Sequence, residues 1–441
     1  RGFIMKIIAL DIGSSFLKSA ILDTKADTLT HKTRTPTPAR LPGEDASCFE
    51  IDADLLYQGV IGLVDDQIQN EPEIGGSFFS TQMHGFVIAQ GTQAITPYLS
   101  WQDSRAERPK PGGSDLQELE EKLGPETIRH MGTRYKAGIA ACSMYAYLKD
   151  HPLDLTGAMF HTLGSYLIYR MNGAQCHACH LTSAASTGFA DAPKGCWNRD
   201  TIDAVGASAL QFPKIVSETE PLGSYKGIPL FADIGDHQAS VYGSAKTIDN
   251  ILSSVVITLG TGGIACAPAK GFVEADMEVR PFFEGNSLMT ITRQPGGRAV
   301  DVIIDFYADL LSAVAGKPVD KQDIWQAMWQ AVPGDTRNLS VKPDFYIDQG
   351  EGAITQIGHA NLTAGNLFAA TLDGLATAYA ASIEKLKALN PGIDRIVLCG
   401  GKLSKNEEMR KRIETATGLP TVFSPNEDEA LWGLGHIAQR I

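Results

Sequence analysis

Leu10-Asp11-Ile12-Gly13-Ser14-Ser15 lies between two apolar runs near the start of the chain. The pattern occurs again at Thr258-Leu259-Gly260-Thr261-Gly262-Gly263, also between apolar runs. Each copy predicts two strands joined by a turn of small residues, which is a β-hairpin rather than the start of a helix. Glycine lets backbone N–H groups crowd around a phosphate, and serine or threonine hydroxyls add donors. Two copies, one in each half of the chain, therefore predict two lobes that close on one nucleotide.

The bulk composition limits the class of protein and of partner. The chain has 441 residues, enough for two or three domains with large buried cores, and 43% of them are hydrophobic, as in ordinary globular proteins. Its formal net charge of -13 argues against nucleic acid or an anionic membrane as the main partner. An acidic protein that binds ATP needs local positive potential, or Mg²⁺, at the phosphates. We therefore expect small-molecule partners, with no nucleic acid and no membrane.

The cysteines and the apolar segments indicate where the protein works. Seven cysteines are scattered without a framework of pairs, which favours reduced thiols and a cytoplasmic location. The stretch Lys6-Ile7-Ile8-Ala9-Leu10 is too short for the core of a signal peptide. The uncharged stretch 251–269 contains proline and several glycines, so a buried hairpin explains it better than a membrane span.

Strand and helix patterns alternate in both halves of the chain, which predicts an α/β architecture. In the C-terminal half we expect a strand over 395–399 that enters Gly400-Gly401. The polar stretch 246–250 precedes the second glycine hairpin. We place the boundary there, which gives an N-terminal lobe of residues 1–246 and a C-terminal lobe of residues 247–441.

The usual nucleotide-binding loops are missing from this sequence. No Gly-x-x-x-x-Gly-Lys-Ser/Thr segment occurs, because Gly401-Lys402 is followed by Leu403. Gly433-Leu434-Gly435-His436-Ile437-Ala438 fits a loose dinucleotide fingerprint, but it lies in a helical pattern near the C-terminus with no βαβ unit after it. Any phosphates are therefore expected at the paired hairpins.

Asp11 is the carboxylate of the first glycine loop. A carboxylate beside a phosphate is repelled unless a cation intervenes, so Asp11 is a candidate ligand of Mg²⁺ or of a metal-bound water. Lys18 follows in the next expected strand and could offset the charge. The alternative interpretation is an aspartate that stabilises the turn, with a lysine at the surface.

A second candidate acid follows a short expected strand at Gly235-Asp236-His237-Gln238 and opens a helix. A carboxylate at this place can accept the proton of a hydroxyl that attacks a phosphoryl group. The alternative is an aspartate that caps the helix N-terminus, which is common at such a spot. One residue can do both.

Met83-His84-Gly85, Trp101, Asp103 and Arg105 combine polar groups with apolar or aromatic faces. A sugar site needs this mixture, because hydroxyls require donors and acceptors while the C–H faces require a flat apolar wall. The alternative is a core tryptophan, a surface Asp–Arg pair and a structural His84.

Cys176-His177-Ala178-Cys179-His180 has a spacing that can bind zinc. A structural zinc site usually takes its other ligand pair from a second loop, and the sequence offers no second cluster. We therefore interpret this segment as a strand or loop without a metal.

Taken in order along the chain, these segments resemble the FGGY family of carbohydrate kinases, within the superfamily of sugar kinases, heat-shock chaperone ATPases and actin. The resemblance implies two actin-like, ribonuclease H-like lobes with an ATP cleft between them and the sugar in the N-terminal lobe. It also leaves a homodimer open. The stretches that carry it are Leu10 to Ser15 with Lys18, Ser80-Thr81-Gln82-Met83-His84-Gly85, Trp101-Gln102-Asp103-Ser104-Arg105, Gly235-Asp236-His237-Gln238-Ala239, and Gly400-Gly401 with Ser404-Lys405-Asn406.

The resemblance implies roles for these residues, with ATP and Mg²⁺ as cofactors. Asp236 would match the general base and Asp11 the acid linked to Mg²⁺. The acceptor would contact Gln82, Met83, His84, Trp101, Asp103, Arg105, Asp236 and His237. The nucleotide would contact Gly13, Ser14, Ser15, Lys18, Gly260, Thr261, Gly262, Gly400, Gly401, Lys405 and Asn406.

The expected function is an ATP-dependent kinase that phosphorylates a ketose, because Met-His-Gly with Trp-Gln-Asp is closer to xylulokinase-like and sedoheptulokinase-like members than to glycerol kinase. The family's common Lys and Trp are replaced by Met144 and Tyr147, which allows another acceptor. Three alternatives stay open: the same chemistry on a polyol or a sugar acid, an actin-like ATPase switch without a sugar, and a non-catalytic sugar sensor.

Overall fold

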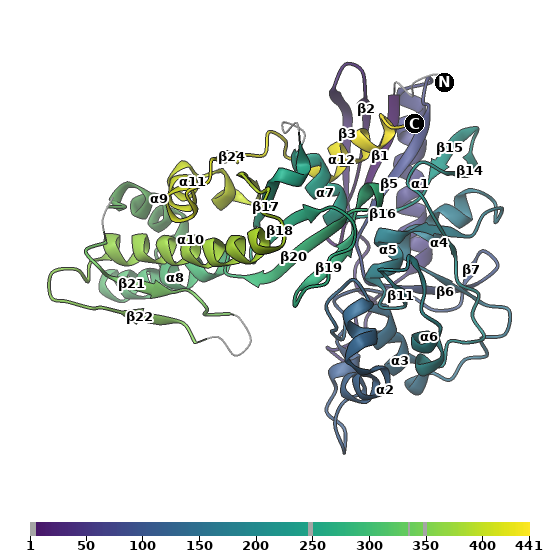
Figure 1. Cartoon of the computed structure of the whole chain (residues 1–441), viewed down its shortest axis with the longest axis horizontal. Coiled ribbons are helices and arrows are strands. Elements are labelled where there is room, and N and C mark those ends of the chain that lie inside the picture. Colours follow the sequence, from purple (N-terminus) through teal and green to yellow (C-terminus); the bar gives the residue numbers. More distant parts are fainter. Residues whose placement is uncertain (1–5, 246–249, 334–335, 347–350) are drawn as a thin grey trace. The chain divides into compact units, whose positions relative to one another are not determined.

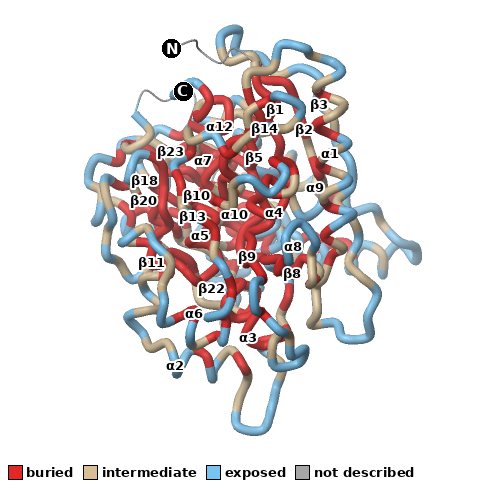
Figure 2. Tube along the Cα trace, turned by 90° about the vertical axis from the view of Figure 1, so that its right-hand side faces the viewer, coloured by how far each residue is buried: buried red, intermediate tan, exposed pale blue. Residues whose placement is uncertain are grey.

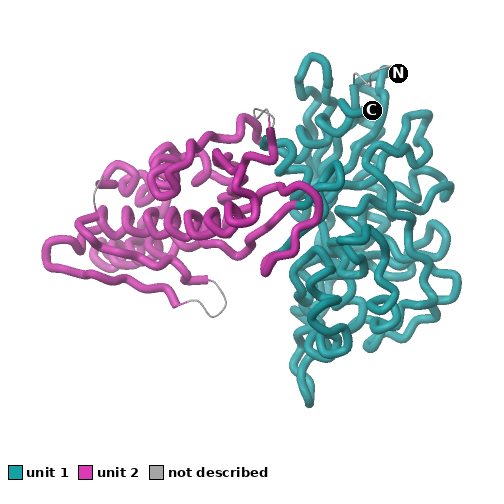
Figure 3. Tube along the Cα trace, viewed as in Figure 1, with its two compact units in different colours: residues 1–246, 278–287, 428–441 teal, residues 247–277, 288–427 magenta. Residues whose placement is uncertain are grey.

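The chain forms two compact units, coloured separately in Figure 3. The computed structural model describes residues 6–245, 250–333, 336–346 and 351–441. The first unit contains residues 1–246, 278–287 and 428–441, and the second contains residues 247–277 and 288–427. The units thus differ from the expected lobes 1–246 and 247–441 in two segments. The C-terminal segment joins the first unit because its helix packs on the sheet and on a helix of that unit.

The first unit is built on a mixed sheet with the strand order β14-β15-β5-β1-β2-β3. Strands β1 and β2 form the predicted antiparallel hairpin. On the other side of β1, β5 runs parallel to it, and β15 and β16 each pair with β5 in parallel. Nearly every residue of β1 and β5 is buried, as in strands covered on both faces. The strands are β1 (Lys6–Ile12), β2 (Phe16–Asp23), β3 (Thr28–Pro36), β5 (Gly76–Thr81), β14 (Pro221–Tyr225), β15 (Ile228–Phe231) and β16 (Ile234–Gly235).

The second unit repeats this arrangement. Its strand order is β20-β18-β17-β23-β24, with β17 and β18 forming the second predicted hairpin and β23 running parallel to β17. Each unit therefore has a glycine hairpin whose first strand has a parallel neighbour. The strands are β17 (Ser254–Leu259), β18 (Gly263–Ala269), β20 (Ser287–Gln294), β23 (Arg395–Gly400) and β24 (Thr421–Phe423).

Helices cover these sheets (Figure 1). Each unit has its own apolar core, and Figure 2 shows the buried residues in red. No helix among the described residues combines the length and the apolar character needed to cross a membrane. The helices are α1 (Ala53–Asn70), α2 (Asp115–His130), α3 (Ala140–Asp150), α4 (Leu163–Met171), α5 (Leu181–Ser186), α6 (Arg199–Val205), α7 (Asp236–Ser244), α8 (Gly297–Ala315), α9 (Lys321–Ala331), α10 (Ala364–Leu389), α11 (Glu407–Thr417) and α12 (Glu429–Ala438). The short strands are β4 (Glu50–Ile51), β6 (Val87–Gln90), β7 (Gln93–Ala94), β8 (Tyr98–Leu99), β9 (Met159–His161), β10 (Ala178–His180), β11 (Ala190–Asp191), β12 (Cys196–Trp197), β13 (Lys214–Val216), β19 (Glu278–Pro281), β21 (Ser340–Lys342) and β22 (Ala353–Thr355).

Helices α7 and α12 cross with their backbones in contact. A Cβ atom on Gly243 would lie 1.8 Å from the carbonyl oxygen of Glu429, and one on Gly433 would lie 2.0 Å from that of Ala239. Glycine at both places lets the helices approach this closely. The Gly-x-Gly pattern near the C-terminus therefore serves helix packing, which explains why it resembles a nucleotide loop without being one. The contact also fixes α7, whose first residue is Asp236.

Asp233 lies between β15 and β16 and is completely buried. Burial raises the pKa of its carboxyl group to about 6, although hydrogen bonds from the Ser183 and Thr162 side chains oppose the rise. A raised pKa in the folded state means that stability present at low pH is lost as the pH rises through about 6. We expect Asp233→Asn to be more stable than the wild type near pH 8, by about 2–3 kcal/mol, with the difference vanishing near pH 4. Denaturant unfolding of both proteins between pH 4 and pH 8 measures this difference in the free energy of unfolding. Equal pH profiles of the two proteins would contradict the prediction.

Candidate active site

Three parallel strands of the first unit end at the same edge of its sheet. Asp11 of β1 pairs with Ser80 of β5, and Ser80 also pairs with Ile234 of β16. The chain leaves these strands as the first glycine loop, as Gln82-Met83-His84 and as Asp236-His237. Ligands of α/β proteins bind at the carboxyl ends of such strands. Three segments singled out in the sequence are therefore brought together.

Asp236 is the first residue of α7 and is partly buried. One of its carboxylate oxygens accepts a hydrogen bond from the N–H of His237 at 2.8 Å. The N-cap position belongs to Gly235, so Asp236 does not serve as the cap of this helix. Burial and the nearby charge of Asp11 raise the pKa of Asp236 to about 7. A carboxylate that gains its proton near neutral pH is suited to general base catalysis.

Asp11 is held by two side chains of its own sheet. Its Oδ1 accepts from the Ser80 hydroxyl at 3.2 Å, and its Oδ2 lies 3.3 Å from Nζ of Lys18 across the hairpin. Burial raises the pKa of the Asp11 carboxyl group, while Lys18 opposes the rise. Lys18 also lies 3.8 Å from Asp428, so it is shared between two carboxylates. The expected charge pairing of Lys18 with Asp11 is present.

The oxygen atoms around the first glycine loop fit Mg²⁺. The side-chain nitrogen of Gln82 donates to the Gly13 carbonyl at 3.4 Å, which leaves Oε1 of Gln82 buried without a hydrogen-bond partner. Within the described residues, no cluster of three or more His, Cys, Asp and Glu side chains could hold a metal. Mg²⁺ is commonly bound by one or two protein oxygens together with waters and phosphates. Asp11, with Gln82 nearby, could supply such a site.

His84 is buried and has a left-handed backbone, with φ of 77°. Its Nδ1 lies 2.7 Å from the carbonyl oxygen of Ser186, which can only accept, so Nδ1 carries the proton and Nε2 is an acceptor. Burial holds the pKa of His84 well below its usual value. A Cβ atom on Gly85 would lie 2.4 Å from the Leu99 carbonyl oxygen, which requires glycine there. The left-handed backbone of His84, a residue other than glycine, is a strain typical of functional sites.

Arg280 of β19 belongs to this site, although sequence reasoning missed it. It is buried, and its Nη1 donates to Nδ1 of His237 at 2.9 Å, which forces the proton of His237 onto Nε2. Its Nη2 binds Glu278 at 2.7 Å. The charge of Arg280 opposes the rise in the pKa of Asp236. Arg280 follows His237 by 43 residues, and no local motif links the two in the sequence.

Asp103 and Arg105 form a buried ion pair rather than the surface pair considered from the sequence. Both oxygens of Asp103 accept from Arg105, at 2.8 Å each, and the backbone N–H of Phe49 donates to Oδ2. The Arg105 guanidinium also binds Glu50. The two side chains bind each other and Glu50 and so brace their loop, while Nη1 of Arg105 is buried without a hydrogen-bond partner. Trp101 is 40% exposed, which excludes the core position considered for it.

The second unit has a corresponding sheet edge. Leu259 of β17 pairs with Gly400 of β23, so the second glycine loop and the segment after Gly400 lie next to each other. The N–H of Gly401 donates to the Leu259 carbonyl at 2.8 Å. A cavity of about 830 Å³ opens here, and Gly260, Thr261, Gly401 and Asn406 line it. Four of the residues expected to contact the nucleotide thus share one cavity.

Two tryptophans, which sequence reasoning missed, line the same cavity from α9. The rings of Trp325 and Trp329 are stacked with centroids 5.9 Å apart, and both pack edge-on against Phe368. The side-chain oxygen of Asn406 caps α11 by accepting from the backbone N–H groups of Glu408 and Met409. The amide nitrogen of Asn406 is therefore left for other contacts. Lys405 binds Glu427 at 2.6 Å and does not line the cavity.

The Cys-His-x-Cys-His segment has other partners in the described structure. Cys179 is buried in β10, and Cys176 is half-buried. His177 lies 3.0 Å from the Phe160 carbonyl oxygen, and His180 caps α5 by accepting from the N–H of Thr182. Both histidines are therefore used in local structure.

Comparison with known proteins was made for sequence and for structure. The sequence models of the N-terminal and C-terminal domains of the FGGY family of carbohydrate kinases match residues 6–250 and 337–438. Sedoheptulokinase of Mus musculus is 22% identical, over 96% of this chain and 95% of its own length.

Two solved structures show the same fold at low identity. Xylulose kinase from Rhodospirillum rubrum has a TM-score of 0.82 at 16% identity, over 98% of this chain and 89% of that one. Glycerol kinase of Plasmodium falciparum, solved with ADP, has a TM-score of 0.82 at 15% identity, over 98% and 88%. The expected α/β fold with two actin-like units is confirmed.

Proposed function

Because the chain belongs to the FGGY family of carbohydrate kinases, which are phosphotransferases with an alcohol acceptor, we propose that it transfers the γ-phosphoryl group of ATP to a ketose hydroxyl, with Asp236 as the general base. One observation carries this assignment. A carboxylate whose pKa is raised to about 7 lies at the strand edge that also holds Asp11 and the Met83-His84 segment. A base, a place for a metal and an acceptor-binding segment are thereby combined in one unit.

Each candidate residue of the first unit would have its own role in phosphoryl transfer. ATP, when bound with Mg²⁺, supplies the phosphoryl group and a cation that neutralises phosphate charge. Asp236 accepts the proton of the attacking hydroxyl at its free carboxylate oxygen, because a neutral hydroxyl is a weak nucleophile. Asp11 and Gln82 would hold the cation. Ser14 and Ser15 would offer backbone N–H donors to the phosphates, since the N–H of Gly13 donates to the Phe16 carbonyl. Most of the rate enhancement would come from positioning and electrostatics.

The acceptor is assigned to a ketose because of the two neutral histidines and the relatives. His84 offers an acceptor nitrogen and His237 a donor, a pair that suits neighbouring sugar hydroxyl and carbonyl oxygens. Met83, which is nearly buried, would provide the apolar contact. Relatives named for sedoheptulose and xylulose are ketose kinases, whereas gluconate kinase from Lactobacillus acidophilus has the same fold. A sugar acid or a polyol is the second candidate acceptor.

We place the adenosine of ATP in the 830 Å³ cavity of the second unit, against the Trp325 ring. Trp325→Leu is expected to weaken ATP, ADP and adenosine alike, roughly tenfold, because stacking of a base on an aromatic ring is worth about 1–3 kcal/mol. Calorimetric titration measures the three affinities. Tripolyphosphate, which has no base, should bind the variant as it binds the wild type, and unchanged adenosine affinity would contradict the placement.

Phosphorus NMR of the complete reaction distinguishes the kinase from an ATPase switch. With a ketose present, the kinase yields a sugar phosphomonoester and ADP. A switch yields inorganic phosphate at a rate that no sugar alters, and a sugar sensor yields neither product. Appearance of the monoester only with a polyol or a sugar acid would keep the chemistry and change the acceptor.

We also propose that the protein works in the cytoplasm. None of the seven cysteines forms a disulfide in the described part of the chain, and several of their thiols are completely buried. Reduced thiols are typical of this compartment, where ATP is available. Fractionation of the producing cells would test the location.

A further inference from the structure

Arg298 stands beside the second glycine loop. It is the second residue of α8, and its backbone N–H donates to the Thr261 carbonyl at 3.0 Å, while the N–H of Gly297 donates to that of Gly260 at 2.9 Å. A Cβ atom on Gly296 would lie 2.6 Å from the backbone of Gly262, so the start of α8 and the loop are in direct contact. The base of the Arg298 side chain is therefore fixed relative to the loop.

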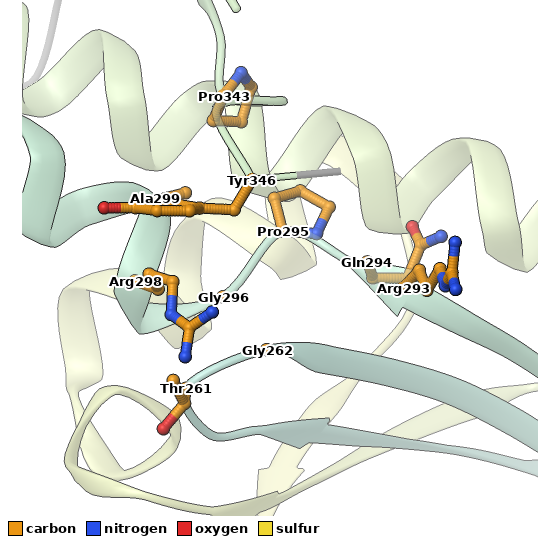
Figure 4. A pocket seen from close by; sticks show the side chains of 10 residues that line it. All are labelled: Thr261, Gly262, Arg293, Gln294, Pro295, Gly296, Arg298, Ala299, Pro343 and Tyr346. Carbon is orange, nitrogen blue, oxygen red and sulfur yellow. The ribbon is translucent and has the colours of Figure 1, made fainter. Parts of the chain in front are cut away.

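The guanidinium group of Arg298 is directed toward Thr261 (Figure 4). Arg298 and Thr261 both line the 830 Å³ cavity and also a neighbouring hollow of about 390 Å³. The side chain is exposed and makes no ion pair with any described residue. The ring of Tyr346 lies 5.2 Å from its guanidinium carbon, a cation–π distance that restrains the side chain while leaving its N–H donors available.

The cavity requires such a cation. Asp301 and Asp320 line it and would repel a nucleotide's phosphates. Of the lysines that line it, Lys321 is paired with Asp305 at 2.5 Å, and Lys402 follows the Gly401 loop. Arg298 is the lining cation whose own backbone N–H is hydrogen-bonded to the loop expected to contact phosphates. Arginine binds phosphate through two parallel hydrogen bonds, which gives both strength and direction.

We propose that Arg298 binds the phosphate chain of the nucleotide, with Tyr346 as the residue that positions it. The proposal rests on the assignment of ATP to this cavity and adds to the glycine loop a side chain that recognises polyphosphate. The backbone loop and the guanidinium group would hold the chain together, so affinity should depend on the number of phosphates. Adenosine, which has no phosphates, would not contact Arg298.

Calorimetric titration of ATP, ADP and adenosine into the full chain, with Mg²⁺, tests this proposal. Arg298→Gln is expected to weaken ATP about 10- to 100-fold, to weaken ADP as well, and to leave adenosine unchanged. Arg298→Lys should recover part of the loss, since it keeps the charge without the paired donors. Tyr346→Leu should give a smaller loss with the same pattern. Added salt should weaken ATP binding less in Arg298→Gln than in the wild type.

Arg293→Gln is the matched control. Arg293 lines the smaller hollow, and Figure 4 shows its side chain directed away from Thr261. The control makes the same change of charge, and ATP should bind it as it binds the wild type. An unchanged ATP affinity in Arg298→Gln, or equal losses of ATP and adenosine, would overturn the proposal. A wild type that binds ATP but phosphorylates no acceptor would overturn the proposed function alone, and one that binds no ATP would overturn both.

Discussion

Asp236→Asn is expected to lower turnover roughly 10²–10⁴-fold, the usual worth of a general base. Asparagine keeps the shape of the side chain, and its oxygen can still accept from the N–H of His237. It cannot take up the proton of an attacking hydroxyl at neutral pH. Affinity for ATP and for the acceptor should therefore be largely retained. Coupled ADP release gives the rate, and calorimetry gives the affinities.

The pH profile provides a second readout of the same residue. Only the ionised carboxylate can accept a proton, and the pKa of Asp236 is raised to about 7. For the wild type, kcat/KM should rise with pH up to about 7 and should fall tenfold for each unit below it. The variant should lose this dependence. A variant with nearly wild-type turnover, or with the same acidic limb, would contradict the assignment.

Asp233→Asn is the matched control for this variant. Asp233 lies only three residues before Asp236, is completely buried, and also has a raised pKa. Its carboxylate binds the Thr162 hydroxyl at 3.0 Å and has no part in the proposed chemistry. Turnover of this control should stay near that of the wild type. A loss as large as that of Asp236→Asn would mean that the loss reflects damage to the strand end.

Asp11→Asn is expected to lower turnover roughly 10²–10³-fold, since an electrostatic group at the reacting charges is worth about this much. The variant should also need more Mg²⁺ to reach half of its maximal rate, because a neutral amide is a weaker ligand than a carboxylate. The charge of Asp11 helps to raise the pKa of Asp236. Its removal should therefore shift the acidic limb of kcat/KM to lower pH.

Rates measured against Mg²⁺ concentration and against pH test both parts of this prediction. Ser80→Ala is the matched control, because it removes the 3.2 Å hydrogen bond to Asp11 and leaves the carboxylate in place. It should change the Mg²⁺ requirement little. An unchanged Mg²⁺ requirement and an unmoved acidic limb in Asp11→Asn would show that Asp11 serves the turn and Lys18 alone.

The sequence predicted the hairpins because their signal is local. A short run of glycine and hydroxyl residues between two apolar runs specifies the turn, and both copies form the expected strands. The sequence indicated in outline that Asp11 and Asp236 approach each other, since Asp11 lies near the end of one buried strand and Asp236 follows another. Only the register of β1, β5 and β16 in the structure places both residues at the same edge of the sheet.

The residues that were missed are joined to the site by tertiary contacts. Arg280 contacts His237 from a strand of the first unit, and residues 247–277, which separate that strand from α7 in the sequence, belong to the second unit. Trp325 lies on an amphipathic helix, where a tryptophan is first interpreted as core. Asp103 and Arg105 were predicted to contact the acceptor, with a surface pair as the alternative, and the structure excludes that alternative because the pair is buried against Glu50. Burial of charge depends on packing from distant segments, which spacing in the sequence does not reveal.

Acceptor-dependent ADP release, measured for the wild type beside Asp236→Asn, tests the central claim most directly. Mg²⁺ and ATP are supplied with a panel of ketoses, polyols and sugar acids. We predict a rate that appears with a ketose, is small without an acceptor, and collapses in the variant. ADP release that is the same for every compound on the panel, in a protein that binds ATP, would contradict the account and favour an ATPase switch.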